Sequence, residues 1–309
     1  MLGMNIIRQI KIFRYCHTRY RKKPKFGSRY LLDKTRTFQF NAWDDVEWDE
    51  NQEQEALKKV QANSVIKFSN EDIAKYENDA YKFWDAFYDI HDNKFFKDRH
   101  WLFTEFPELN DTGKEKEFNI FEVGCGVGNT ICPIIQYSKN EKLKVYGCDF
   151  SEKAINILKN CETFDKKRCD VFVLDISNEN WLLPFDQNSM DIIIMIFVLS
   201  AINPERFKNV ISNIYQYLKP GGILLFRDYG RYDLAQLRFK PGRSLGCNFY
   251  VRGDGTRVYF FSQEEIRHLF KESNFIELEN KADRRLQVNR GKLLKMYRVW
   301  IQAKYQKPT

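Results

Sequence analysis

The sequence lacks the cysteine pattern of a zinc site or a disulfide framework. Its seven cysteines form no Cys-x-x-Cys pair, and their number is odd. Disulfides accumulate in secreted chains, whereas thiols stay reduced inside cells. We therefore expect free cysteines, an intracellular compartment and no bound metal.

Long apolar runs are also missing. The longest covers residues 192–199 (IIIMIFVL), far short of the roughly 20 residues that a membrane-spanning helix needs. We expect a soluble protein with no membrane partner. At 309 residues the chain can bury a full hydrophobic core, and it shows no internal repeat.

Acidic residues are absent from residues 1–32, which carry nine Lys and Arg residues. The rest of the chain is nearly neutral, so the net charge of +8 comes from this end. Residues 1–25 combine bases with apolar residues at helical spacing, as a mitochondrial transit peptide does. A disordered arm that contacts RNA phosphates is the equal alternative. We expect a cytoplasmic protein, with mitochondrial import through this segment as the alternative.

Three glycines at alternate positions follow an apolar stretch in the sequence FEVGCGVGN. Glycine is required where the backbone turns sharply or a ligand approaches it closely. Open α/β sheets bind nucleoside cofactors at such a loop between a strand and a helix. The spacing of Gly124, Gly126 and Gly128, with Glu122 before them, differs from the G-x-G-x-x-G of dinucleotide-binding folds. It resembles the first motif of class I S-adenosylmethionine-dependent methyltransferases.

Strands and helices alternate after these glycines, which predicts a parallel, doubly wound α/β sheet. Together with the resemblance of the glycine motif, this implies a class I methyltransferase (Rossmann-like) fold. We expect a seven-stranded, mostly parallel sheet with helices on both faces and an N-terminal helical extension. The predicted strands are residues 120–123, 143–148, 171–174, 191–200, 223–226, 275–279 and 296–303. The predicted regions are a basic segment (1–25), a helical RNA-binding and cofactor-lid region (26–109) and the methyltransferase domain (118–309).

Acidic residues end two of the predicted strands. Asp149 follows the glycines by some twenty residues, where a carboxylate can accept hydrogen bonds from ribose hydroxyls. Asp175 and Ile176 follow the next strand, where an adenine amino group and ring would lie. The turn KPGG at residues 219–222 is also typical of class I methyltransferases. We therefore predict S-adenosyl-L-methionine as the cofactor.

The methyl acceptor is indicated by other segments. Residues 93–101 alternate bases with aromatic rings (NKFFKDRHW), as stacking and phosphate pairing on single-stranded RNA require. Residues 75–90 have the apolar spacing of an amphipathic helix.

Two other kinds of methylation are excluded by missing motifs. The fourth strand lacks the Asn/Asp-Pro-Pro-aromatic motif of exocyclic-amine methylases, and no Pro-Cys pair offers a thiolate for cytosine C5 methylation.

Longer motifs resemble the tRNA cytidine N3-methyltransferases over about residues 26–308. They include FWDAFY (83–88), FFKDRHW (95–101), FRDYG (226–230) and NFYVRGDGTR (248–257). The resemblance implies formation of 3-methylcytidine at position 32 of the tRNA anticodon loop. It implies cofactor contacts by Trp84, Tyr88, Gly124, Gly126, Asp149, Asp175, Ile176 and Ile196. A methyltransferase for a small metabolite and an inactive cofactor-binding subunit are the alternatives.

Cytosine N3 carries a free lone pair, so positioning matters more than a general base. Methylation creates a cation, which a nearby carboxylate stabilises. We predict that Asp228 has this role at the mouth of the site. The alternative is that Asp228 pairs with Arg227 or Arg231 and only orders the loop. Phe96 is predicted to hold the base that has turned out of its stack.

The predicted partner is the tRNA anticodon stem-loop, bound by a monomer across a composite basic surface. Its predicted phosphate contacts are Lys97, Arg99, Arg227, Arg252, Arg257 and Arg298. Bracing of Arg252 and Arg257 against Asp254 is the alternative. Since relatives often depend on an aminoacyl-tRNA synthetase or other helper protein, a protein partner is also open.

Overall fold

The structure is a computed structural model that describes residues 29–110 and 116–309. The basic segment 1–25 lies outside these residues, so neither interpretation of it is tested. Within the described ranges, no helix is both long enough and apolar enough to cross a membrane.

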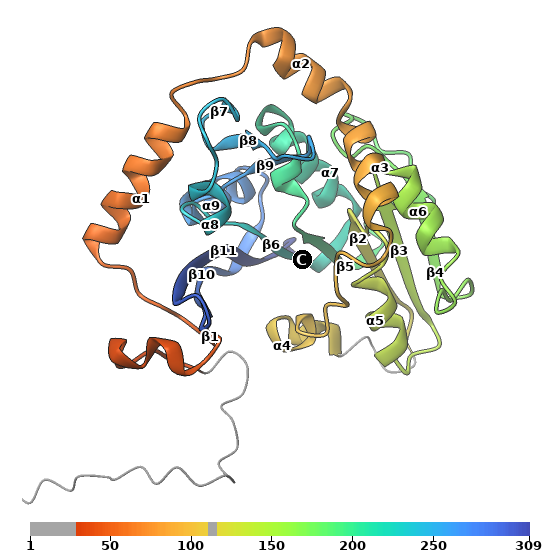
Figure 1. Ribbon diagram of the computed structural model, residues 1–309. Helices are drawn as coiled ribbons and strands as arrows, with labels where there is room; N and C mark the ends of the chain where they lie inside the picture. The colour runs from red at the N-terminus through yellow and green to blue at the C-terminus, as the bar shows by residue number, and fades with distance from the viewer. Residues whose placement is uncertain (1–28, 111–115) are drawn as a thin grey trace, which may run out of the picture.

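An eight-stranded sheet forms the centre of the molecule, in the order β1-β10-β11-β6-β5-β2-β3-β4 (Figure 1). Five neighbouring strands are parallel, and three antiparallel strands complete one side. The parallel strands are β2 (Phe118–Val123), β3 (Leu143–Asp149), β4 (Cys169–Val173), β5 (Met190–Ile196) and β6 (Leu218–Tyr229). The antiparallel ones are β10 (Ile276–Asn289), β11 (Leu294–Gln306) and β1 (Ala42–Trp43).

The prediction of seven strands was therefore one short. The additional strand is β1, whose Ala42 and Trp43 pair with Gln287 and Leu286 on the outer side of β10. Two residues are too few to show the alternating pattern that identifies a strand in a sequence. The last two strands are also much longer than predicted.

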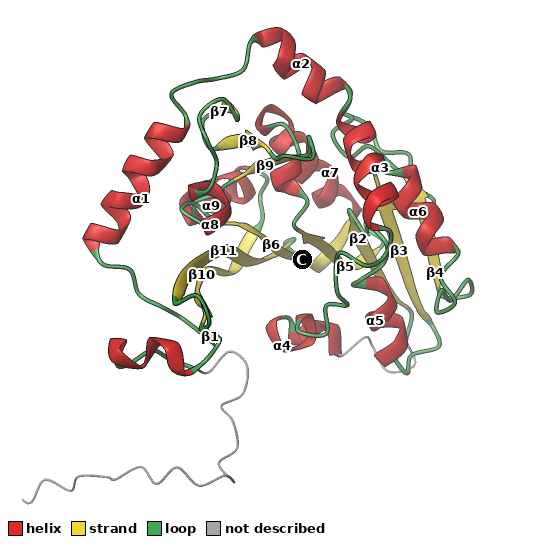
Figure 2. Cartoon of the chain, in the orientation of Figure 1, coloured by secondary structure: helices red, strands yellow, loops and turns green. Residues whose placement is uncertain are grey.

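Helices cover both faces of the sheet (Figure 2). On one face the core includes residues of α4 (Leu102–Glu105), α5 (Ile131–Tyr137) and α6 (Glu152–Lys159). On the other it includes residues of α7 (Phe207–Tyr217) and α9 (Gln263–Glu272). Successive residues of β5 point to opposite faces, so Ile193 and Met195 join one core and Ile192 and Ile194 the other. This explains why the strand is apolar throughout.

Side-chain caps begin several helices where the sequence predicted them. The Ser151 side chain accepts a hydrogen bond from the Ala154 N–H at the start of α6. Ser262 and Glu265 form a reciprocal capping box at the start of α9. The predicted helix over residues 75–90 is instead two helices, α2 (Asn70–Asn78) and α3 (Ala80–His91), separated at Asp79.

The N-terminal region runs along the outside of the molecule as an arch (Figure 1). It consists of η1 (Lys34–Gln39), β1, α1 (Glu50–Asn63), α2 and α3, followed by α4 and η2 (Pro107–Asn110). A small sheet made by the insertion after β6 lies inside the arch. The two are joined by hydrogen bonds from the Phe68 N–H to the Ser244 carbonyl (3.1 Å) and between the hydroxyls of Ser64 and Tyr250 (2.9 Å).

The remaining elements are short. The insertion holds α8 (Leu234–Leu237) and the antiparallel strands β7 (Ser244–Gly246), β8 (Phe249–Val251) and β9 (Arg257–Tyr259). Two 3-10 turns, η3 (Leu199–Ala201) and η4 (Pro204–Arg206), connect β5 to α7. The carboxyl ends of the parallel strands, α3 and this insertion all face the same side of the molecule, where a ligand site is expected in an open α/β sheet.

Candidate active site

The glycine loop between β2 and α5 has the conformation that its sequence predicts. Gly124, Gly126 and Gly128 have φ angles of +68°, +54° and +87°, in the left-handed region that other residues rarely adopt. A Cβ atom at Gly126 would lie 2.7 Å from the hydroxyl oxygen of Tyr88. Glycine is therefore required here both by the turn and by the close approach of α3.

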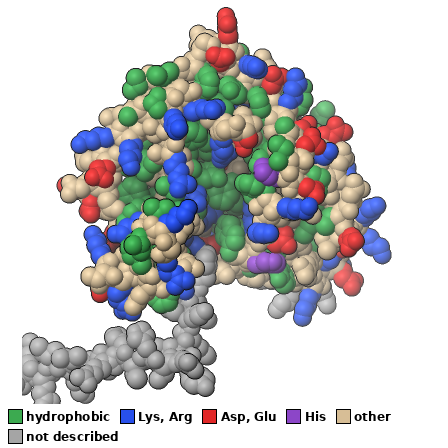
Figure 3. All heavy atoms as spheres, in the orientation of Figure 1, with side chains coloured by type: hydrophobic (Ala, Val, Ile, Leu, Met, Phe, Trp, Pro, Cys, Tyr) green, Lys and Arg blue, Asp and Glu red, His purple; other side chains and the backbone are tan. Residues whose placement is uncertain are grey.

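A cavity of about 1550 Å³ opens beside this loop. Figure 3 shows a hollow on this face with hydrophobic side chains inside and Lys and Arg side chains around it. Its volume exceeds the roughly 300–1,000 Å³ of a typical small-molecule pocket. The cavity can therefore hold more than a nucleoside cofactor.

All eight predicted cofactor residues line this one cavity. They come from α3, the glycine loop and the carboxyl ends of β3, β4 and β5: Trp84, Tyr88, Gly124, Gly126, Asp149, Asp175, Ile176 and Ile196. The structure thus brings together residues that are spread over more than a hundred positions of the sequence. Their individual contacts with a cofactor remain predictions.

Asp149 has a structural role in addition to the predicted one. Its carboxylate accepts hydrogen bonds from the backbone N–H groups of Gly126 (2.8 Å) and Ser151 (2.9 Å). Desolvation raises the pKa of Asp149 to about 6, against the effect of these hydrogen bonds. The carboxylate therefore ties the glycine loop to the end of β3.

Two polar contacts attach α3 to α6. The Ser151 hydroxyl donates a hydrogen bond to Asp85 (2.5 Å), and Lys153 forms an ion pair with Asp89 (2.6 Å). On the same helix, Tyr88 is buried, and burial raises the pKa of its hydroxyl well above the usual value. These contacts hold Trp84 and Tyr88 over the glycine loop.

Arg99 lies deeper in the site than is expected of a residue that contacts a phosphate. Its backbone N–H donates to the Asn129 carbonyl (2.9 Å), and its guanidinium lies 3.7 Å from the buried carboxylate of Glu122. Burial raises the pKa of Glu122 to about 7, although Arg99 and a hydrogen bond from Thr130 act in the opposite direction. Glu122 is recognisable in the sequence as part of the glycine motif, but its pairing with Arg99 is not, because the two residues lie 23 positions apart.

Strand β5 ends at Ile196 because Phe197 adopts a left-handed conformation with φ of +61°. A bulky residue in this region is strained, and such strain is concentrated at functional sites. Phe197 lines the cavity, and its ring centroid is 5.1 Å from that of Tyr229. The prediction that the strand continues to Ser200 was wrong here, since an apolar run gives no sign of a positive φ angle.

The predicted base-holding residue Phe96 also lines the cavity. It is half-buried, and its ring packs against Phe87 (5.8 Å between centroids) and Phe95 (4.8 Å). The ring is therefore held in place at the edge of the site.

The prediction that Asp228 lies at the mouth of the site was wrong. It is fully buried and does not line the cavity. Its carboxylate accepts the backbone N–H groups of Ser200 (2.9 Å) and Tyr229 (2.8 Å), and burial raises its pKa to about 6. Asp228 therefore fixes the η3 turn and Tyr229, and it can act on the cavity only at a distance.

The prediction that Arg227 contacts RNA was also wrong, because its side chain is buried. It pairs with Asp283 (2.5 Å) and donates to Gln302. Its guanidinium lies between the rings of Trp101 (5.1 Å) and Trp300 (4.9 Å). A residue with these partners cannot reach a phosphate.

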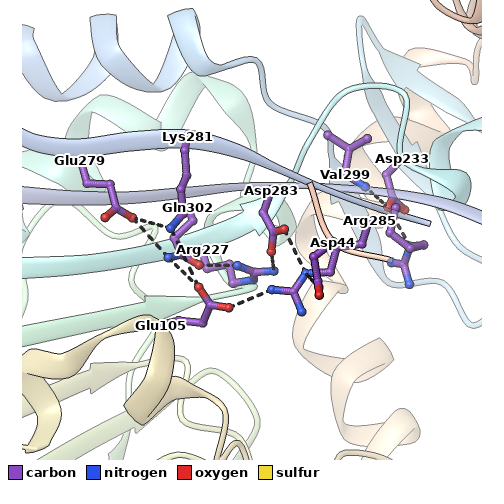
Figure 4. A network of polar contacts seen from close by, with 11 residues as sticks. Asp44, Glu105, Arg227, Asp233, Glu279, Lys281, Asp283, Arg285, Val299 and Gln302 are labelled. Atoms are coloured by element: carbon purple, nitrogen blue, oxygen red, sulfur yellow. Dashed lines mark hydrogen bonds and ion pairs between the residues drawn. The ribbon is translucent and has the colours of Figure 1, made fainter. Parts of the chain in front are cut away.

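Figure 4 shows that Arg227 belongs to a larger polar network. Glu105 of α4 accepts from Arg285 (2.8 Å) and Gln302 (3.3 Å) on the C-terminal hairpin. Arg285 also lies 3.0 Å from Asp283 and 3.7 Å from Asp44. The network joins the segment that carries Arg99 and Trp101 to strands β10 and β11.

Ion pairs reduce the predicted composite basic surface, and its remaining RNA contacts stay predictions. Acidic residues from distant segments neutralise several of its arginines: Arg257 pairs with Glu77, and Arg298 with the buried Asp233 (2.8 Å). Net charge along a segment does not reveal such pairing. Lys97 is exposed at the cavity, and it has no carboxylate within 4.0 Å among the described residues.

Arg252 remains available to a ligand. Its guanidinium lies 5.4 Å from the Tyr229 ring and donates to the Thr256 hydroxyl (3.3 Å) and the Arg257 carbonyl (3.2 Å). Across residues 29–110 and 116–309, no carboxylate lies within ion-pair distance of it, so the predicted alternative of bracing against Asp254 does not hold. Arg252 lines the same cavity as the glycine loop.

Comparison with known proteins agrees with this architecture. A family model described as a methyltransferase domain matches residues 121–224. Among solved structures, the PH0226 protein from Pyrococcus horikoshii OT3 has a TM-score of 0.53 at 16% identity, covering 72% of this chain and 98% of that chain. At such low identity this likeness concerns the fold alone.

Two curated relatives are far more similar. The chain is 57% identical over 311 residues to "tRNA N(3)-methylcytidine methyltransferase Mettl2" of Drosophila melanogaster, covering 99% of this chain and 96% of that protein. It is 52% identical over 321 residues to "tRNA N(3)-cytidine methyltransferase METTL2" of Xenopus tropicalis, covering 93% and 95%. Identity of this degree along nearly the whole length shows a shared family, and the chain accordingly belongs to the tRNA N(3)-cytidine methyltransferases.

Proposed function

We propose that the protein transfers the methyl group of S-adenosyl-L-methionine to N3 of cytidine at position 32 of the tRNA anticodon loop. The observation that carries this proposal is a single cavity lined both by the glycine loop and by residues suited to RNA. Among the latter are Phe96 and Lys97 of the N-terminal region and Arg252 of the insertion. Position 32 follows from the resemblance of the sequence motifs to this family.

The residues at the glycine loop fit the cofactor. Gly124 and Gly126 leave their backbone open to a ligand, and the carboxylates of Asp149 and Asp175 lie where ribose and adenine donors are expected. Trp84 and Tyr88 would cover it from α3. When bound, S-adenosylmethionine supplies an electrophilic methyl group on a sulfonium.

The chain's own residues have to present cytosine N3, which lies on the pairing edge of the base. The base must be unstacked and held in the cavity, which an aromatic surface can do. Phe96, Phe197 and Tyr229 offer such a surface beside Ile196. Since the N3 lone pair is free at neutral pH, fixing it in line with the methyl group is the main contribution of the protein.

The cations at the cavity suit a phosphate backbone better than a small metabolite. Lys97, in the loop after α3, and Arg252, in the insertion, both line the cavity. A turned-out nucleotide would bring its flanking phosphates near these two cations. The names of the relatives, which give tRNA cytidine as the acceptor, support the same choice over a small metabolite.

We further propose that one chain acts on the anticodon stem-loop, since its own residues supply both the glycine loop and the candidate RNA contacts Phe96, Lys97 and Arg252 in one cavity. The test uses purified protein, tritiated S-adenosylmethionine and tRNA transcripts. Digestion and chromatography should reveal labelled 3-methylcytidine, which should disappear when position 32 is changed to uridine. Label in another nucleoside, or incorporation that does not depend on position 32, would contradict the proposal.

A further inference from the structure

The turn between β8 and β9 packs against the helices that cover the cofactor side of the cavity. This 252–257 turn is closed by hydrogen bonds from the Arg252 N–H to the Thr256 carbonyl (2.8 Å) and from the Gly255 N–H to the Arg252 carbonyl (3.1 Å). Asp254 accepts the N–H and the hydroxyl of Thr256 (2.9 and 2.7 Å). The turn is therefore ordered by its own backbone and does not need Arg257 for its shape.

Arg257 connects this turn to α2. Its side chain is only 7% exposed, and it forms an ion pair with Glu77 in the last turn of the helix. Its guanidinium also lies 5.7 Å from the Phe249 ring. Because Arg257 is largely removed from water while the Glu77 side chain is 33% exposed, Arg257 depends on this pair more than Glu77 does.

A second contact lies directly beside the ion pair. Gly255 has φ of +86°, and a Cβ atom there would overlap the ring of Phe83 on α3. The ring of Phe83 in turn packs against Tyr76 of α2 (5.4 Å between centroids). The 252–257 turn thus contacts both helices on either side of the break at Asp79.

The opposite side of α3 lies against the glycine loop. There Tyr88 approaches Gly126, and Asp85 and Asp89 bind Ser151 and Lys153 of α6. Helix α3 is therefore fixed from two sides, each time with an aromatic side chain next to a glycine of positive φ. The position of Trp84 and Tyr88 over the cofactor site depends on both sides.

We propose that Arg257 is a positioning residue for the cofactor site, which acts through Glu77 to hold α2 and α3 in place. This rests on the assignment of Trp84 and Tyr88 to the cofactor in the proposed function. It differs from the sequence-based expectation that Arg257 contacts RNA and that its loss spares the cofactor. Both arginines of this turn line the cavity, but Arg257 is buried and paired with Glu77, whereas Arg252 has no carboxylate within ion-pair distance in the described part of the chain.

The experiment compares Arg257→Gln, Glu77→Gln and the double variant Glu77→Gln/Arg257→Gln with the unaltered protein. Isothermal titration with S-adenosylhomocysteine measures cofactor-site affinity, and circular dichroism confirms folding. Glu77→Gln leaves the buried charge of Arg257 unpaired, and Arg257→Gln removes the residue that holds the end of α2. In both variants we therefore expect a loss of affinity of about tenfold or more. The double variant removes both charges and should recover most of that loss, because two neutral groups can replace a buried pair at small cost.

Arg243→Gln is the matched control, since Arg243 is an exposed arginine of the same insertion outside the cavity. It should bind S-adenosylhomocysteine normally. The salt dependence of tRNA binding should be the same in Arg257→Gln as in the unaltered protein, because no phosphate contact is lost. Folded Arg257→Gln with normal S-adenosylhomocysteine affinity and a shallower salt slope would overturn the proposal in favour of an RNA contact.

The methylation assay on tRNA separates this inference from the proposed function. If the unaltered protein forms no 3-methylcytidine, the proposed function fails whatever the affinities are. If it forms 3-methylcytidine and the double variant binds S-adenosylhomocysteine no better than the single variants, the inference about Arg257 alone fails.

Discussion

The hydroxyl of Tyr88 lies against Gly126, at 2.7 Å from the position that a side chain would occupy. The N-terminal region and the methyltransferase fold are therefore in contact at the most constrained point of the glycine loop. Any change that enlarges residue 126 acts on both parts at once.

Gly126→Ala should reduce S-adenosylhomocysteine affinity by more than tenfold. The added methyl group would collide with Tyr88, and the left-handed backbone costs a non-glycine residue about 1–2 kcal/mol. Titration calorimetry measures the affinity. Gly246→Ala is the control, because nothing lies within 4 Å of its side-chain position. Equal affinities in both variants would argue against the close approach of α3.

Asp149→Ala should lose cofactor affinity and also stability. A hydrogen bond to a charged group is worth about 1.5–3 kcal/mol, which applies to each ribose contact. The Gly126 and Ser151 N–H groups would lose their acceptor as well. We expect a lower free energy of unfolding in urea without cofactor, in contrast to the purely ligand-binding role that the sequence suggested. Unchanged stability would mean that water replaces the carboxylate.

Arg227→Ala should destabilise the protein by about 1–3 kcal/mol, since Asp283 keeps only Arg285 of its two arginine partners and Gln302 loses its buried donor. The salt dependence of tRNA binding by the remaining folded protein should not change, because Arg227 does not reach RNA. Arg290→Ala, an exposed arginine in the turn between β10 and β11, should leave the unfolding free energy nearly unaltered. A stable Arg227→Ala variant with a weaker salt dependence would return Arg227 to the RNA surface.

Arg252→Ala should weaken tRNA binding while sparing S-adenosylhomocysteine affinity. If Arg252 contacts one phosphate, its loss should flatten the slope of log affinity against log salt by about one unit. Filter binding at several salt concentrations gives this slope. Arg243→Ala, outside the cavity, provides the comparison on the same insertion. A parallel salt dependence in both variants would show that Arg252 has only an internal role.

Glu122 should make stability depend on pH. Its pKa rises from 4.5 to about 7 in the folded protein, so the folded state binds more protons between these values. Stability should then fall as the pH rises through this window, by up to about 3 kcal/mol. The free energy of unfolding of Glu122→Gln, measured at pH 5 and pH 8, should fall less. The raised pKa values of Asp149 and Asp228 also lower stability as the pH rises, but they do so in both proteins. The difference between the two pH profiles therefore reports on Glu122. Parallel pH profiles would contradict the raised pKa.

The sequence predicted the parallel part of the sheet and the glycine loop because both depend on local patterns. Apolar runs mark buried strands, and the alternating glycines require a left-handed loop. The errors concern pairing over long distances. Arg227 and Arg257 are neutralised by ion pairs with Asp283 and Glu77. The sequence does not reveal these pairs, because the partners lie far apart along the chain. The positive φ angle of Phe197 could not be predicted from the sequence either, since it is set by the surrounding structure and not by residue type.

The pairing of β1 with β10 has a consequence for how the protein is made. Ala42 and Trp43 are synthesised early, but their partners Leu286 and Gln287 emerge close to the end of translation. Contacts between residues so distant in sequence form slowly, because a long loop must close first. Strand β1 must therefore wait for nearly the whole chain before it reaches its final position, whereas α3 can contact α6 and the 252–257 turn earlier. Ribosome-bound chains that end before β10 should be cut by protease around residues 42–43 while α3 is already protected.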